Sequence, residues 1–135
     1  PHPPPPPPPR IFFSCSGDHR DIHLSIRRQR QMCIIDSRFS KEAGVPMVYG
    51  GLYRYEGQVA VLNANGSASY GELFPEPPSG GNTCADAGVL GMLPGIIGNI
   101  QALETVKLII GIKPNLIGKL LIYDGINHTI QTIEL

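Results

Sequence analysis

The sequence predicts an α/β fold in which short strands accompany one long buried helix and the chain closes on a β-hairpin. Three observations predict this fold. The segment from Gly44 to Leu62 contains short apolar runs bounded by glycine, which are typical of strands. The segment from Pro94 to Ile110 is apolar at helical spacing and is followed by Gly111, a common helix stop. Asp124-Gly125 is a strong turn signal between two strand-like runs near the end of the chain.

The composition limits the classes of protein to which the chain can belong. With 135 residues, the chain is long enough for one modest domain with its own core. Eleven basic residues balance eleven acidic ones, so the overall charge gives no reason to expect a nucleic-acid partner. Seven of the basic residues but only three of the acidic ones lie within residues 1–41. We therefore treat residues 1–41 and 42–135 as two separate segments of different character.

Residues 1–41 are proline-rich and basic. Pro3 to Pro9 should form an extended polyproline helix without a core, either as a disordered leader, which we expect, or as a ligand for a proline-binding module. Arg27 to Arg30 is a basic run without interleaved aromatic residues, and no helical or strand periodicity is sustained from Arg10 to Lys41. We expect residues 1–41 to be disordered or foreign in origin, through a shifted reading frame or a fusion, rather than a nucleic-acid patch.

The first part of residues 42–135 predicts strands and turns. Gly44 to Gly51 predicts a short buried strand, and Leu52 to Leu62 predicts a second strand with a bend at Glu56-Gly57. Asn63 to Gly66 is a hairpin-type turn, after which we expect Ser69 to Phe74 to return as a strand.

One long helix is expected between Pro94 and Gly111. Proline suits the first turn of a helix, because its missing N–H would be unpaired there in any case. Gln101, Glu104 and Lys107 form one narrow polar stripe on an otherwise apolar circumference, which predicts that most of the helix is buried. The longest apolar stretch, around Val89 to Ile100, is broken by Asn99, Gln101, Glu104 and Lys107, so we expect it to be too short and too polar to span a membrane.

Cys84 is the candidate nucleophile. The three cysteines, Cys15, Cys33 and Cys84, form no CxxC pair and no even-numbered disulfide framework, which predicts a reducing, cytoplasmic setting. Cys84 lies in a polar segment flanked by glycines, ahead of the long helix, and a helix N-terminus favours a thiolate. From spacing alone, a structural cysteine is the alternative to a catalytic one. A proline run stands where a signal peptide would have its basic start and apolar stretch.

No metal site and no nucleotide site are expected from the motifs. His128 falls on the closing hairpin without a second histidine or carboxylate at ligand spacing, which predicts a solvent-facing side chain. His19 and His23 have helical spacing, but the sequence around them does not support a helix. No GxGxxG loop follows a strand, and no P-loop motif occurs.

Several ordered blocks between Gly44 and Leu135 resemble the ThiF/MoeB/HesA family, relatives of the ubiquitin-activating enzymes. The blocks are Ala43-Gly44-Val45-Pro46-Met47-Val48-Tyr49-Gly50, Tyr55-Glu56-Gly57-Gln58-Val59, Leu73-Phe74-Pro75-Glu76-Pro77-Pro78, Cys84 through Gly98, Gln101-Ala102-Leu103-Glu104-Thr105-Val106-Lys107 and Ile122-Tyr123-Asp124-Gly125. The resemblance implies the C-terminal half of a Rossmann-like activating-enzyme domain. It also implies a function, because family members use ATP and Mg²⁺ to adenylate the C-terminal Gly-Gly of a ubiquitin-like sulfur carrier, in molybdopterin or thiamine sulfur transfer, and form homodimers.

The same resemblance assigns roles to a few positions. Cys84 matches the loop cysteine that some members use in thioester or persulfide transfer, and Asp36 is the candidate for the aspartate near the magnesium ion. Gly50 to Gln58 would help to line the channel for the carrier's tail. In zinc-binding members the first CxxC pair would fall at Ser69 and Glu72, so the resemblance implies no zinc here.

The nucleotide-binding half of the family has no counterpart in this sequence, because its glycine-rich loop, arginines and lysine are missing. The resemblance therefore implies an adenylyltransferase that lacks its ATP site and is inactive as an isolated chain. The alternative is a non-catalytic remnant, or a module that binds the carrier's tail without activating it. Neither nucleic acid nor a membrane is expected as a partner.

Overall fold

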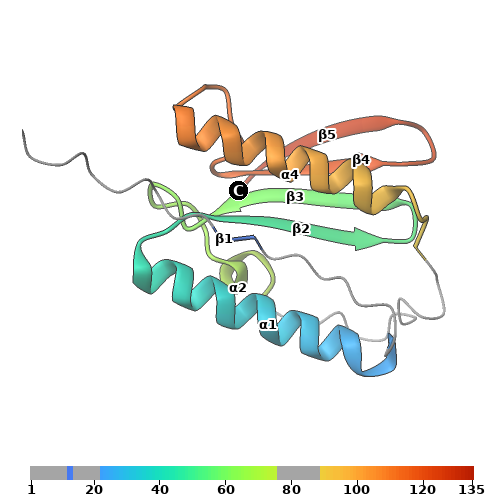
Figure 1. Ribbon diagram of the computed structural model, residues 1–135, viewed down its shortest axis with the longest axis horizontal. Helices are drawn as coiled ribbons and strands as arrows, with labels where there is room; N and C mark the ends of the chain where they lie inside the picture. The colour runs from blue at the N-terminus through green and yellow to red at the C-terminus, as the bar shows by residue number, and fades with distance from the viewer. Residues whose placement is uncertain (1–11, 14–21, 76–88) are drawn as a thin grey trace, which may run out of the picture.

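The strands of the protein form one five-stranded sheet in the order β1-β2-β3-β4-β5 (Figure 1). The computed structural model describes residues 12–13, 22–75 and 89–135. Its elements are β1 (Phe12–Phe13), α1 (Ile22–Ala43), β2 (Met47–Tyr53), β3 (Glu56–Leu62), α2 (Tyr70–Leu73), α4 (Leu93–Ile110), β4 (Lys119–Asp124) and β5 (Thr129–Glu134). β1 pairs with β2 in parallel, and all other neighbouring strands are antiparallel. The expected α/β architecture with a long helix and a terminal hairpin is confirmed.

Two layers of helices enclose the sheet, with α4 on one face and α1 and α2 on the other (Figure 1). Alternation along β3 supplies both cores, since Val59 and Val61 point toward α4 whereas Ala60 and Leu62 point toward α1 and α2. All four side chains are fully buried. Burying a valine or leucine side chain contributes roughly 1.5–3 kcal/mol, so both faces of β3 hold the layers together.

The hairpin between β2 and β3 is tighter than the sequence predicts. Tyr53 pairs with Glu56, so the turn consists of Arg54 and Tyr55, and Arg54 adopts a φ of 51°. The bend expected at Glu56-Gly57 is therefore wrong, because Gly57 pairs with Leu52 inside the ladder. Glycine stands at that position for lack of space rather than for its flexibility, since a Cβ there would lie 2.2 Å from Ile97 Cδ1.

The terminal hairpin is confirmed, and Asp124 organises its turn. Asp124 pairs with Thr129, and its carboxylate accepts hydrogen bonds from the Ile126 N–H at 2.8 Å and from Asn127 Nδ2 at 2.7 Å. These bonds lower the pKa of Asp124, the Asn127 side chain having the largest effect.

The segment that ends at residue 41 is helical in its second part, so the expectation that it carries no regular structure is wrong from Ile22 onward. Helix α1 runs to Ala43, and Gly44 follows with a φ of 65°. Its inner side has small or polar residues at core positions: Ser37 and Ser40 are buried. Because these buried positions are not apolar, a search for apolar residues at helical spacing does not detect this helix. His23 lies on α1, whereas His19 lies outside the described residues.

Buried hydrogen bonds fix the end of α1 to the turn that follows β3. Asn63 Nδ2 donates to Ser37 O at 2.8 Å, and it also lies 3.2 Å from Ser40 Oγ. Ser40 Oγ in turn donates to Val45 O. The two serines thus replace apolar packing by satisfied polar contacts.

The strand expected over Ser69–Phe74 is instead the single-turn helix α2. The Ser69 N–H donates to Glu72 Oε2 at 2.6 Å, and Ser69 and Glu72 form a capping box. Tyr70 is then buried, and its ring lies 5.3 Å from that of Tyr49 in an edge-on arrangement. The capping box and this aromatic contact stabilise a helix rather than a strand at these residues.

Helix α4 begins and ends where the sequence predicts, but its orientation differs from the prediction. Pro94 lies in its first turn, and Gly111 ends it with a φ of 74°. The expectation that most of α4 is buried is wrong, because Gln101 and Glu104 face the sheet while apolar residues such as Leu103 and Val106 are exposed. By length and composition alone α4 is apolar enough to cross a membrane, contrary to the expectation, although core helices of globular proteins pass this test as well.

Candidate functional site

Three segments that are distant in sequence meet at one end of the sheet. Val89 forms a parallel bridge with Arg54, and the Leu90 N–H donates to Arg54 O at 3.1 Å. From the other side, the Gly125 N–H donates to Tyr55 O at 2.7 Å. A Cβ on Gly125 would lie 2.7 Å from that same oxygen, so only glycine allows the two hairpin turns to approach this closely. This end of the sheet is therefore held in place by backbone hydrogen bonds.

A shallow pocket of about 140 Å³ lies over β2 and β3 beside this rim, and it is lined by Tyr49, Gly51, Leu52, Tyr53, Glu56 and Gln58. Gly51 leaves space above the strand, and Tyr49 Oη occupies part of it, 2.3 Å from where a Cβ would lie. Gln58 Nε2 donates to Glu56 Oε1 at 3.2 Å, which holds both side chains along the pocket. The pocket is thus lined by a glycine, which has no side chain, and by phenol, amide and carboxylate groups.

The Tyr49 side chain forms the buried end of this pocket. Its pKa is raised well above the ordinary range, first by burial and then by the neighbouring Tyr70 and Cys33. The phenol also shares a hydrogen bond with Tyr70, and like any tyrosine it is protonated at neutral pH. Because the sequence-predicted channel begins at Gly50, Tyr49 was missed. The signal that could have found it is strand alternation, which places residues 49, 51 and 53 on one face.

The opposite face of the same hairpin carries helix α4. A Cβ on Gly50 would lie 2.5 Å from Gln101 Cδ, so the missing side chain makes room for Gln101. Within the segment from Gly50 to Gln58, five residues line the pocket, whereas Gly50 and Gly57 serve the contact with α4. The structure therefore places this predicted segment on a pocket, and its use by a carrier's tail stays a prediction.

The structure does not bring the two predicted site residues together. Cys84 lies outside the described residues. Asp36 lies on α1 beside the buried Ser37 and is partly exposed, and its carboxylate makes no hydrogen bond or ion pair with another described residue. Its role near a magnesium ion stays a prediction.

The pocket on β2 and β3 does not fit the phosphates of ATP. No basic side chain lines the pocket, and the nearby Arg54 guanidinium lies over the Tyr53 ring, 5.5 Å from its centre. Across the described ranges 12–13, 22–75 and 89–135, no three His, Cys, Asp or Glu residues are grouped so that they could hold a metal ion. His128 is exposed, as expected, and its Nδ1 lies 2.9 Å from Tyr123 Oη.

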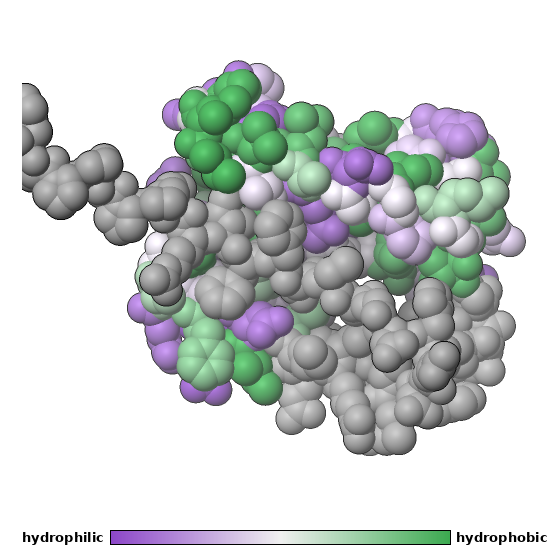
Figure 2. All heavy atoms as spheres, in the orientation of Figure 1, coloured by the Kyte–Doolittle hydropathy of each residue, from purple (hydrophilic) through white to green (hydrophobic). Residues whose placement is uncertain are grey.

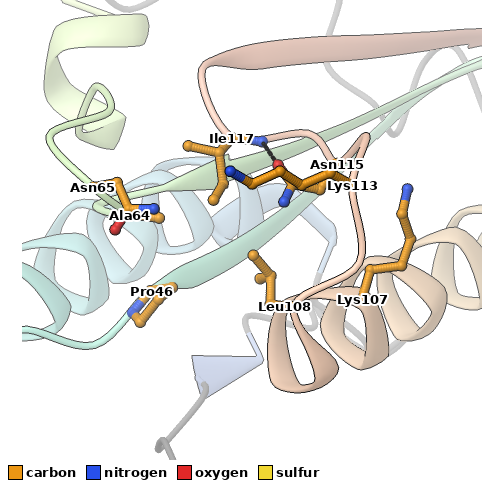
Figure 3. Close-up of a pocket in the computed structure, with 9 residues that line it drawn as sticks. Pro46, Ala64, Asn65, Lys107, Leu108, Lys113, Asn115 and Ile117 are labelled. Atoms are coloured by element: carbon orange, nitrogen blue, oxygen red, sulfur yellow. Dashed lines mark hydrogen bonds between the residues drawn. The ribbon is translucent and has the colours of Figure 1, made fainter.

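A second pocket, of about 230 Å³, lies at the opposite end of the sheet (Figure 3). Leu108 and Ile117 supply apolar walls, and Lys113 and Asn115 stand at its edge. The remaining cation, Lys107, is paired with Glu104 at 2.5 Å. This pocket borders none of the predicted site residues.

Comparison with known proteins identifies relatives over most of the chain. A family model described as the ThiF family matches residues 29–135. The adenylyltransferase and sulfurtransferase MOCS3 of Aedes aegypti is 45% identical over 92 residues, which cover 67% of this chain and 21% of that protein. The SAMP-activating enzyme E1 of Haloferax volcanii is also 45% identical over 92 residues, covering 67% of this chain and 34% of the enzyme. The sulfur carrier protein adenylyltransferase of Thermus thermophilus is 39% identical over 97 residues, with coverages of 67% and 36%.

Solved structures show the same fold at low sequence identity. Escherichia coli MccB, solved with ATP, aligns with 92% of this chain and 36% of its own, with a TM-score of 0.58 and 10% identity. PaaA aligns with 74% of this chain and 31% of its own, with a TM-score of 0.55 and 22% identity. The chain spans about a fifth to a third of the length of the curated relatives named above. Because the family model covers residues 29–135, well over half of the sequence, the chain belongs to the ThiF family.

Proposed function

We propose that this chain is the carrier-binding part of an adenylyltransferase that activates the C-terminal Gly-Gly of a ubiquitin-like sulfur carrier. The observation that carries the proposal is the 39–45% identity to proteins named adenylyltransferase or activating enzyme, over a segment that contains the pocket on β2 and β3. ATP and Mg²⁺ would be held outside this pocket, because no basic side chain lines it and the described residues contain no group of three metal-ligating side chains.

The pocket suits an extended, narrow peptide. Gly51 adds no side chain of its own, so a tail of two glycines can lie beside the Tyr49 hydroxyl, which fills part of the space above β2. The Tyr49 phenol and the Gln58 amide lie in the wall, where they are able to hydrogen bond with the peptide groups of such a tail. A bulkier tail would collide with Tyr49 and Tyr53, which gives the pocket a preference for small residues.

Cys84 is proposed as the thiol that attacks the acyl-adenylate, forming a thioester with the carrier's C-terminus and releasing AMP. Val89, five positions after Cys84 in the sequence, is anchored at Arg54 beside the pocket. The described chain thus resumes, five positions after Cys84, at the rim where the carrier's tail would end. We also propose a cytoplasmic homodimer without a nucleic-acid or membrane partner, on the basis of the family resemblance and of the dispersed cysteines.

The second candidate function is a module that binds the carrier's tail without activating it. The observation that favours it is that the pocket on β2 and β3 has polar groups for a peptide but no basic side chain for the phosphates of ATP. The two functions differ in ATP chemistry alone, so a single pair of assays separates them.

The first assay measures the binding of a peptide that ends in Gly-Gly, by fluorescence anisotropy, to the chain and to Gly51→Val. The added side chain would fill the pocket where Tyr49 already lies, so we expect the affinity to fall by roughly tenfold or more. The matched control is Gly71→Ala, because nothing lies within 4 Å of a Cβ there. Equal binding by Gly51→Val, in a chain with an unchanged circular dichroism spectrum, would remove the pocket from the proposal.

The second assay measures ATP–pyrophosphate exchange with a Gly-Gly-ended carrier protein. Exchange that depends on this chain would support the adenylyltransferase and would rule out the module. Peptide binding without exchange would support the module. Cys84→Ser should leave exchange unchanged, because a residue that receives the acyl group acts after adenylation.

A further inference from the structure

Two turns of the molecule place a glycine directly after a carboxylate or an amide side chain. They are Asn65-Gly66, in the turn that follows β3, and Asp124-Gly125, in the turn that follows β4. In either turn, the backbone nitrogen of the glycine can attack the side-chain carbonyl carbon of the preceding residue and close a cyclic imide. Glycine favours this reaction because it has no Cβ to crowd the attacking nitrogen. The two turns differ in whether the fold leaves these groups free.

The Asp124-Gly125 turn holds both reacting groups in hydrogen bonds. The Gly125 N–H donates to Tyr55 O at 2.7 Å. The Asp124 carboxylate accepts hydrogen bonds from the Ile126 N–H at 2.8 Å and from Asn127 Nδ2 at 2.7 Å. Ring closure at this turn would first have to break these bonds, so the fold protects it.

The Asn65-Gly66 turn leaves the same groups free. Both residues are exposed, and neither the Gly66 N–H nor the Asn65 amide makes a hydrogen bond with another residue of the described ranges. A Cβ on Gly66 would have nothing within 4 Å, so the attacking nitrogen lies in open space. The bonds of the turn lie on either side of the reacting groups, since the Ser67 N–H donates to Ala64 O at 2.8 Å and the Ala64 N–H donates to Ser67 Oγ at 2.9 Å. An exposed turn of this kind opens locally at little cost.

Asn65 also differs from the other asparagines that the structure describes. Each of those is followed by a residue with a side chain, whereas Asn65 is followed by glycine. The side-chain amides of the other four all donate a hydrogen bond within the fold, namely Asn63 to Ser37 O, Asn99 to Gly95 O, Asn115 to Ile112 O and Asn127 to the Asp124 carboxylate. Within the described ranges, Asn65 alone combines a free amide with a following glycine.

We propose that Asn65 is a site of spontaneous covalent modification, at which the folded chain converts this asparagine into aspartate and isoaspartate. The Gly66 nitrogen forms a bond with Asn65 Cγ, and the side-chain nitrogen leaves as ammonia, taking the proton of the Gly66 N–H. Water then opens the imide. Cleavage of the new bond between nitrogen and Cγ gives aspartate, whereas cleavage of the original peptide bond gives isoaspartate. The net reaction exchanges water for ammonia and needs neither an oxidant nor an enzyme.

The modification would add a negative charge to the second pocket. Asn65 and Lys113 both line that pocket, and Lys113 makes no ion pair with another described residue (Figure 3). The described residues that line it include no carboxylate. The neighbouring surface is apolar, because Figure 2 shows hydrophobic residues gathered at the C-terminal end of α4, where Ile110 is 61% exposed. The product would therefore place an acid in a pocket whose unpaired charge is that of Lys113.

Isoaspartate would also change the backbone, because its main chain runs through the side-chain carboxyl and is longer by a methylene group. The hydrogen bond from the Ser67 N–H to Ala64 O spans residues 65 and 66, so a longer backbone should break it. The variant Asn65→Asp has the new charge without the extra methylene group. It therefore provides the reference that distinguishes the two products.

The test incubates the whole wild-type chain in mildly alkaline buffer and maps the products by peptide mass spectrometry, with isoaspartate detected by an isoaspartate methyltransferase. We expect Asn65 to convert roughly tenfold or more faster than Asn115 and Asn127, because a lost hydrogen bond of ordinary strength alone changes a rate by up to about that factor. Asp124 should form isoaspartate in urea but not in the folded chain. The matched control is Asn65→Gln, which should lose the methylation signal of the folded chain.

Several outcomes would overturn the proposal. One is an Asn65 that stays intact in the folded chain, including one that reacts only in urea, since the fold would then protect this turn as well. Another is conversion of Asn115 or Asn127 as fast as that of Asn65. A third is isoaspartate at Asp124 of the folded chain at the rate found at Asn65, because the hydrogen bonds would then have no effect. The proposal does not depend on carrier binding, which involves the pocket at the other end of the sheet.

Discussion

Gln101 on α4 and Val48 on β2 are joined by a hydrogen bond of 3.2 Å, from Gln101 Nε2 to the Val48 carbonyl. The glutamine side chain occupies the volume that a Cβ on Gly50 would need, at 2.5 Å from its Cδ. Because Gly50 has no side chain, the Gln101 amide can be buried beside it. This arrangement sets how closely α4 approaches the sheet and which side of the helix faces outward.

Gly50→Ala should destabilise the fold by about 1–3 kcal/mol, because the new methyl group displaces Gln101 and leaves a buried amide unpaired. Urea unfolding monitored by circular dichroism measures the effect. In a double-mutant cycle, Gln101→Ala should relieve part of the cost by opening space, so the two changes should not be additive. Additive effects, or an unchanged midpoint for Gly50→Ala, would contradict this account.

Glu104→Gln should also be destabilising, by about 1–3 kcal/mol. The buried carboxylate accepts one hydrogen bond from the Leu116 N–H and one from Lys107, and a neutral amide cannot accept both in the same way. The unfolding free energy of Glu104→Gln is to be compared with that of Glu134→Gln, which makes the same change at an exposed position on β5. A similar loss in both variants would show that the buried location of Glu104 has no special effect.

Asn63 and Asn65 provide a matched pair within one turn, since both adopt positive φ values, 56° and 50°. Asn63→Asp removes the donor that bonds to Ser37 O and places a carboxylate against that carbonyl, so we expect a loss of roughly 2 kcal/mol or more. Asn65→Asp, at an exposed position, should change stability by less than about 0.5 kcal/mol. Thermal unfolding of the two variants tests this difference directly.

Acid should weaken the cap of α2. Hydrogen bonds from Ser69 lower the pKa of Glu72 below its ordinary value of 4.5, with a smaller effect from Lys41. Because the folded-state pKa is the lower one, the contribution of Glu72 to stability is present above pH 4.5 and is lost as the pH falls through the folded-state value. Unfolding of the wild-type chain and of Glu72→Ala should therefore differ at neutral pH and converge in acid. Glu42→Ala, an exposed change on α1, serves as the control.

Elements with local signals were predictable from the sequence, whereas those that depend on distant partners were not. Pro94 and Gly111 mark the ends of α4, and Asp124 marks the last turn, because their effects act within a few residues. The inner side of α1 was not recognised, since Ser37 and Ser40 are stabilised by Asn63, which lies more than twenty residues away. The buried positions of α1 carry polar serines, whereas a search for an amphipathic helix looks for apolar residues there.

The misassigned face of α4 has the same origin. Gln101, Glu104 and Lys107 read as a solvent-facing stripe, but the acceptor for Gln101 is on β2 and the donor to Glu104 follows the helix. At the candidate site, the range from Gly50 to Gln58 was located by resemblance, while Tyr49 follows from strand alternation, which places it on the same face as Gly51. Asp36 was found at a position with no supporting contact among the described residues.

The bond between the Gly125 N–H and Tyr55 O has a consequence for motion. It joins the turn after β4 to the turn after β2, and the Leu90 N–H is bonded to Arg54 in that same turn. The three segments should therefore open as one unit rather than one by one. In native-state hydrogen exchange, the amides of Leu90 and Gly125 should show the same protection, and both should lose it in Gly125→Ala. A substrate that reaches this rim would therefore find the three segments either all ordered or all open.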